Sequence, residues 1–175
     1  MCKCMTVKYI VFVLFFVAII SCRNNNENTI NTSRPGKNEM ADLNRYLVQK
    51  DRERIQNYIV RKNLKMIESP TGLWYQITRA GAGEYFTDNN KIFIDYELSL
   101  LDGTKCYSSK NLGTKEVILG STEIEAGLNE GLRMLKPGAE AIFIIPSFLA
   151  HGLVGDGKMI PSRAIIVYSI VVAPK

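Results

Sequence analysis

The sequence has few of the residues that metal centres and nucleophilic active sites need. Its 175 residues include one histidine and four cysteines. Three of the cysteines, Cys2, Cys4 and Cys22, lie within the first 22 residues. No cluster of cysteine, histidine and carboxylate residues has metal-ligand spacing, so we predict no metal site. Cys106 is the one cysteine after residue 22, so no disulfide can form within that part of the chain.

An excess of charge of one sign is also missing. The formal net charge is +5, and Lys3 and Lys8 contribute two of these charges from a segment that we predict to be removed. The remaining chain therefore carries 5 − 2 = +3. Because this charge is small and evenly spread, we predict that the protein does not bind nucleic acid.

The longest uncharged apolar run, Tyr9 to Ile20, has twelve residues. A helix that crosses a membrane needs about 20, whereas twelve suits the apolar region of a secretory signal. The run ends in Ile19-Ile20-Ser21-Cys22, which resembles the bacterial lipobox. That resemblance implies that residues 1–21 are a lipoprotein signal peptide and that Cys22 carries a lipid. An uncleaved anchor or an ordinary signal peptide is the alternative.

Composition divides the rest of the chain into a tether, a helical extension and a domain. Residues 22–38 are polar and rich in Asn, which predicts a flexible tether with a reach of roughly 20 Å. Residues 39–68 form the predicted helical extension, with apolar residues three or four apart. Its centre, residues 49–54, has no apolar residue, so we expect the helix to be bare or broken there. The narrow apolar stripe suits packing on its own domain or, within residues 40–64, pairing with a second copy.

Residues 69–175 change to the period of two that is typical of strands. Strands are expected at 73–77, 92–100, 117–119, 141–145 and 164–172. One short helix is expected between the third and fourth of these strands. Thr122 and Glu125 have the spacing of a capping box at its start, and Gly127 and Gly131 suggest close approach to another backbone or side chain. The predicted fold class is α+β, a twisted antiparallel β-sheet wrapped around one short α-helix.

Several motifs of residues 69–175, in order, resemble those of FKBP-type peptidyl-prolyl cis-trans isomerases. They include Leu101-Asp102-Gly103-Thr104, Lys136-Pro137-Gly138, Ala150-His151-Gly152 and Ile160-Pro161. The lipobox, the preceding helix and Leu112-Gly113-Thr114 are similar to the gliding-motility-associated isomerase lipoproteins of gliding bacteria. The resemblance implies an FKBP-like fold and action, without a cofactor, on unfolded or proline-containing exported polypeptides.

The resemblance also implies which residues form the site. Rotation about an X–Pro bond faces a barrier of about 20 kcal/mol, and binding the twisted amide more tightly than the planar one lowers it. No nucleophile or metal is needed for this. The backbone N–H of Glu125 is expected to receive the substrate carbonyl. The expected site residues are Tyr96, Ile124, Glu125, Leu128, His151, Ile160 and Tyr168, with Cys106, Tyr107 and Val117 as further pocket-lining positions.

Four of these positions depart from the family pattern. The family usually has a large aromatic residue at Cys106, Asp at Tyr107 and Tyr at His151, and it often has Trp at Leu128. Two interpretations therefore remain open. One is an active isomerase that assists the folding of exported proteins. The other is an FKBP-like binding module or chaperone with weak turnover, associated with a gliding or secretion apparatus.

The residues after the lipobox bear on location. Arg23-Asn24-Asn25 lack the Asp that marks retention in the inner membrane of some bacteria. The expected location is therefore the outer membrane, with the domain facing the periplasm.

Overall fold

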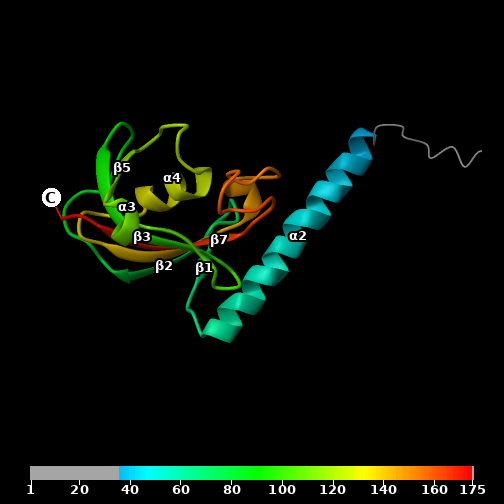
Figure 1. Ribbon diagram of the computed structural model, residues 1–175, viewed down its shortest axis with the longest axis horizontal. Coiled ribbons are helices and arrows are strands. Elements are labelled where there is room, and N and C mark those ends of the chain that lie inside the picture. Colours follow the sequence, from blue (N-terminus) through cyan, green and yellow to red (C-terminus); the bar gives the residue numbers. More distant parts are fainter. Residues whose placement is uncertain (1–35, 175) are drawn as a thin grey trace, which may run out of the picture. The chain divides into compact units, whose positions relative to one another are not determined.

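The computed structural model describes residues 36–174 (Figure 1). The predicted signal peptide, Cys22 and nearly all of the predicted tether lie outside the described residues. The chain separates into residues 1–37 and residues 38–175, and the account below concerns the second unit. Among the helices of the described part, none is both long enough and apolar enough to cross a membrane.

The strands of the described residues form one antiparallel sheet in the order β1-β2-β6-β7-β3-β4, with β5 paired to β3. The long strand β3 pairs with β5 through its first half and with β4 through its second half, and β7 runs along its other edge. The strand bounds are β1 Ile67–Glu68, β2 Trp74–Arg79, β3 Lys91–Leu100, β4 Lys105–Ser108, β5 Lys115–Ile118, β6 Glu140–Ile145 and β7 Ile166–Val172.

Helix α4 (Ala126–Arg133) lies across one face of this sheet (Figure 1). Two glycines permit the close contact. A Cβ at Gly131 would lie 2.7 Å from the Phe143 ring, and one at Gly127 would lie 2.4 Å from Ile145 Cγ2. Leu128 completes the buried face of the helix. The predicted α+β class and the close approach at the two glycines are confirmed.

The predicted capping box at the start of α4 is wrong. The helix begins at Ala126, Glu125 is its N-cap residue, and the Glu125 side chain makes no capping hydrogen bond. Its carboxylate instead accepts a hydrogen bond of 3.0 Å from the Tyr168 hydroxyl. Because the Glu125 carboxylate is bonded to the Tyr168 hydroxyl, it does not cap the backbone N–H groups of its own helix.

Helix α2 (Lys37–Lys62) is unbroken and ends earlier than predicted. Residues 49–54, which were expected to be bare or broken, are helical throughout, and most of them are exposed. The exception is Asp51, which is buried against the domain. The helix ends before residue 68. Asn63 adopts a left-handed φ of 52°, and β1 then pairs with β2.

The C-terminal half of α2 packs on its own domain. Ile55 and Tyr58 form a cluster with Ile144 and Val167 of the sheet. Their neighbours Phe143 and Tyr168 point to the other face and belong to the main core. The central strands β6 and β7 are therefore buried on both faces, which explains why their apolar runs are continuous rather than alternating.

Two shorter helices complete the described fold. Helix α3 (Ser109–Leu112) follows β4, and the Ser108 hydroxyl accepts a hydrogen bond from the N–H of Lys110 at its start. The 3-10 helix η1 (Ser147–Leu149) begins the long connection from β6 to β7. That connection, residues 146–165, carries two predicted site residues, His151 and Ile160.

Candidate active site

The expected site residues come together on the side of the sheet that faces α4. The Tyr96 and Tyr168 rings lie on neighbouring strands with centroids 5.9 Å apart and planes tilted by 51°. Leu128, Ile160 and Val117 are buried in the same core, and Ile124, Cys106 and Tyr107 pack partly exposed against it. The structure thus gathers an apolar, aromatic-rich cluster beside the N-terminus of α4.

Glu125 brings a carboxylate into this cluster. Its side chain is only 8% exposed. Oε1 accepts a hydrogen bond from the Tyr168 hydroxyl at 3.0 Å and lies 3.2 Å from His151 Nε2. The second contact is close enough for an ion pair, but its angle does not make a hydrogen bond. Glu125 therefore links β7, α4 and the β6–β7 connection.

Two polar atoms at this point are buried without a hydrogen-bond partner, Glu125 Oε2 and His151 Nε2. Buried polar groups are nearly always paired, so these two atoms mark a polar point within an otherwise apolar cluster. The backbone N–H of Glu125 lies at the same end of the cluster. At the N-cap of α4 it has no carbonyl within the helix to bond to, which suits its expected role as donor to a substrate carbonyl.

The two tyrosines keep their protons. Burial, followed by the Glu125 carboxylate, raises the pKa of Tyr168 and also that of Tyr96. Both phenols are therefore neutral at physiological pH and can donate hydrogen bonds.

Asp156 was not predicted as a site residue. Its carboxylate accepts hydrogen bonds from the Tyr107 hydroxyl and from the N–H groups of Lys158 and Ile160, the latter two at 2.8 Å each. Burial alone would raise the pKa of Asp156, but these hydrogen bonds and the nearby His151 lower it to about 2. Asp156-Gly157 signals a turn in the sequence, and nothing near it in sequence indicates the distant Tyr107.

Cys106 is a partly buried thiol that packs against the core. Its Sγ lies 3.6 Å from the Met159 carbonyl oxygen. Burial, then the Asp156 and Asp102 carboxylates, raise its pKa. The thiolate required of a nucleophile is therefore disfavoured. In the described part of the chain, no group of three or more His, Cys, Asp or Glu side chains could hold a metal ion.

A sheet wrapped around a short helix, with tyrosines from two strands converging beside the helix N-terminus, defines the class of protein as a prolyl-isomerase-like domain. Residues 83–173 match the family model described as FKBP-type peptidyl-prolyl cis-trans isomerase. The chain belongs to this family.

Curated relatives agree with this assignment. The chain is 38% identical over 100 residues to the probable FKBP-type peptidyl-prolyl cis-trans isomerase FkpA of Neisseria meningitidis, a match that covers 57% of this chain and 36% of the relative. It is 30% identical over 120 residues to the FKBP-type peptidyl-prolyl cis-trans isomerase FkpA of Buchnera aphidicola, a match that covers 66% of this chain and 49% of the relative. The matched part is thus less than half of either relative.

Solved structures share the fold. The crystal structure of FkpA from Escherichia coli superposes with a TM-score of 0.62 at 24% identity, covering 81% of this chain and 73% of that chain. The crystal structure of AtFKBP13 gives a TM-score of 0.60 at 25% identity, covering 63% of this chain and 98% of that chain.

Proposed function

We propose that the protein is a peptidyl-prolyl cis-trans isomerase that acts on unfolded or proline-containing exported polypeptides. The observation that carries this is the convergence of Tyr96, Tyr168 and the N-terminus of α4 around one partly exposed apolar cluster in a chain of this family. The cluster favours the less polar, twisted amide over the planar one. The N–H of Glu125 holds a carbonyl of the substrate in place while the bond rotates.

An isomerisation assay on a proline-containing peptide tests the proposal. Uncatalysed rotation takes about 10–100 s at 25 °C, so acceleration by micromolar full chain is readily measured. Leu128→Ala, which removes a fully buried side chain next to the cluster, is expected to lower kcat/KM. Absence of acceleration by the unaltered chain would contradict isomerase activity.

The second candidate is a binding module that holds extended segments and turns over poorly. It is favoured by the substitutions at Cys106, Tyr107, Leu128 and His151 and by the unpartnered polar atoms at Glu125 and His151. This candidate requires measurable binding of unfolded chains together with negligible isomerisation. A robust isomerase rate that falls in step with peptide binding on His151→Ala excludes it.

We further propose that the protein is a lipoprotein, attached through Cys22 to the outer membrane and facing the periplasm. The support is the lipobox and the polar residues that follow it. Mass spectrometry of the mature N-terminus should find an acylated Cys22, and Cys22→Ser should release the chain from the membrane fraction. Fractionation that places the unaltered chain in the soluble fraction would contradict this.

The resemblance to gliding-associated lipoproteins leads to one further expectation. Deleting the gene should impair surface spreading or secretion, and a copy with Leu128→Ala should restore it only if the role is not catalytic. Unimpaired spreading and secretion in the deletion strain would remove the association with such an apparatus.

A further inference from the structure

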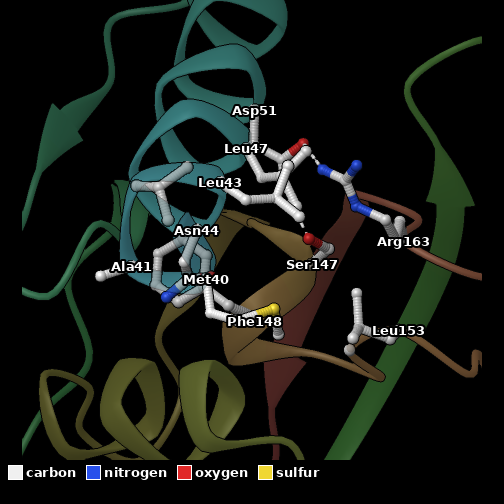
Figure 2. Close-up of a pocket in the computed structure, with 12 residues that line it drawn as sticks. Met40, Ala41, Leu43, Asn44, Leu47, Asp51, Ser147, Phe148, Leu153 and Arg163 are labelled. Atoms are coloured by element: carbon white, nitrogen blue, oxygen red, sulfur yellow. Dashed lines mark hydrogen bonds and ion pairs between the residues drawn. The ribbon is translucent and has the colours of Figure 1, made fainter. Parts of the chain in front are cut away.

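Asp51 is a buried carboxylate that the candidate site does not itself use. It lies in the middle of α2 and is 2% exposed. Figure 2 shows it between Ser147 and Arg163, both of which belong to the β6–β7 connection. Asp51 Oδ2 accepts a hydrogen bond of 2.5 Å from the Ser147 hydroxyl. Its Oδ1 lies 3.6 Å from Arg163 Nη2 and 3.7 Å from Arg54 Nη1.

The two partners from the connection stand at its opposite ends. Ser147 is in η1, directly after β6, and Arg163 is three residues before β7. Arg163 has a left-handed φ of 56°, a conformation that non-glycine residues adopt only when surrounding contacts hold them. One carboxylate of α2 therefore contacts both ends of residues 146–165.

Backbone hydrogen bonds inside the connection link Ser147 and Arg163 to Gly152, which is next to the site residue His151. The Ser147 carbonyl accepts from the N–H of Gly152 at 2.8 Å, and the Gly152 carbonyl accepts from the N–H of Arg163 at 2.9 Å. His151 lies beside Gly152. Further along, the N–H of Asp156 donates to the Ile160 carbonyl at 3.1 Å, and Asp156 Oδ1 accepts from the N–H of Ile160.

A buried carboxylate is costly unless its partners compensate it, and removing those partners is destabilising. Arg54 of the same helix supplies part of this compensation through Oδ1. The hydrogen bond to Oδ2 and a second ion pair to Oδ1 come from Ser147 and Arg163, 96 and 112 residues further along the chain. We propose that Asp51 is a positioning residue for the candidate site. Through Ser147 and Arg163 it fixes the β6–β7 connection, and thereby sets the positions of His151, Asp156 and Ile160. Its effect on catalysis rests on the proposed isomerase function.

Hydrogen exchange of the full chain measures the positioning directly and needs no activity. Asp51→Ala removes a hydrogen bond to a charged group, so amides of residues 148–163 should exchange about tenfold faster or more, while those of β3 and β6 change less. Ser147→Ala, which removes only the hydroxyl, should give the same local pattern and serves if Asp51→Ala does not fold. Asp51→Asn keeps an oxygen acceptor for Ser147 and should restore most of the protection.

Arg52→Ala is the matched control. Arg52 is adjacent in α2, but its ion pair of 2.6 Å is with Glu68 of β1, so residues 148–163 should keep their exchange rates. In the isomerase assay, Asp51→Ala should lower kcat/KM several-fold and Arg52→Ala should not.

Faster exchange spread evenly over sheet and connection, or unchanged exchange at residues 148–163, would overturn the proposal. Local loosening in a chain whose unaltered form does not isomerise peptides would support the positioning and contradict only the isomerase function.

Discussion

At the scale of single residues, Glu125 connects three elements of the site through its contacts with Tyr168 and His151. A carboxylate that is 8% exposed keeps one oxygen on the Tyr168 hydroxyl and one without a partner. The cost of burying this carboxylate is therefore offset by few hydrogen-bond donors. Loss of one donor leaves a buried acceptor unpaired, which lowers the free energy of unfolding.

Replacing Tyr168 with Phe tests this dependence. The change should lower the free energy of unfolding by about 1–3 kcal/mol, because Glu125 Oε1 loses its hydrogen-bond donor. In a Glu125→Leu background, the same replacement should be neutral or stabilising, since the hydroxyl then has no acceptor. Urea unfolding of the four proteins gives the coupling energy. An equal effect in both backgrounds would contradict the assigned hydrogen bond.

The Tyr107–Asp156 pair predicts a pH dependence. The pKa of Asp156 is about 2 in the folded chain, below its ordinary value of about 3.9. The stabilisation is therefore present above about pH 4 and is lost as the pH falls through about 2. Tyr107→Phe removes one donor to the carboxylate, so the pKa of Asp156 should rise.

Urea unfolding at several pH values checks this. At pH 6, Tyr107→Phe should cost about 0.5–1.5 kcal/mol, and the difference from the unaltered chain should shrink as the pH falls below 4. Tyr85→Phe, at an exposed position, should have little effect at any of these pH values. A cost for Tyr107→Phe that does not depend on pH would show that the Asp156 carboxylate is not its partner.

At the scale of elements, α4 depends on the absence of side chains at its glycines. Ala is a better helix former than Gly by about 1 kcal/mol, yet a Cβ at Gly131 would lie 2.7 Å from the Phe143 ring. Overpacking of this kind costs about 1–3 kcal/mol. We therefore expect Gly131→Ala to destabilise the domain.

A space-creating change provides the control. In a Phe143→Leu background, Gly131→Ala should cost less or be stabilising, because the ring that it would meet is gone. Thermal unfolding of the two single variants and the double variant measures this. An equal cost in both backgrounds would place the conflict elsewhere in α4.

At the scale of the whole molecule, the C-terminal half of α2 is packed on the domain, whereas its N-terminal half is mostly exposed and presents a few apolar side chains among polar ones. Ile55 and Tyr58 are buried against the domain, so a second copy could use only the first half of the proposed segment 40–64. There, Met40, Leu43, Leu47, Phe148 and Leu153 line an apolar pocket, with Leu43 49% exposed (Figure 2).

The homodimer that residues 40–64 offered as an alternative to packing on the domain would have to form through this half of α2, and its test is the oligomeric state of the full chain. Sedimentation velocity should detect such a dimer, and Leu43→Glu should convert it to a monomer by placing a charge in the apolar contact. Val60→Glu, at a position 79% exposed in the packed half, should leave the dimer intact. A monomer at high concentration of the unaltered chain would exclude the dimer.

The sequence alone predicted the fold class and most strand positions. Strand and helix periods are local, and the strand at 92–100 and the amphipathic face with Leu128 and Leu132 follow from them directly. The ordered motifs implied Tyr96, Ile160 and Tyr168 as site residues, and the structure places Ile160 and Tyr168 in the main core with Tyr96 packed against it.

Only the tertiary structure decided how the polar side chains are used. Glu125 meets Tyr168, Tyr107 meets Asp156, and Asp51 meets Ser147 across 43, 49 and 96 residues of sequence. Periodicity indicates which side of an element a residue occupies, and says nothing of the distant group that it contacts there. The absence of apolar residues from 49–54 therefore predicted a bare or broken helix. In the structure Asp51, within that stretch, is buried between Ser147 and Arg163 and contacts the β6–β7 connection.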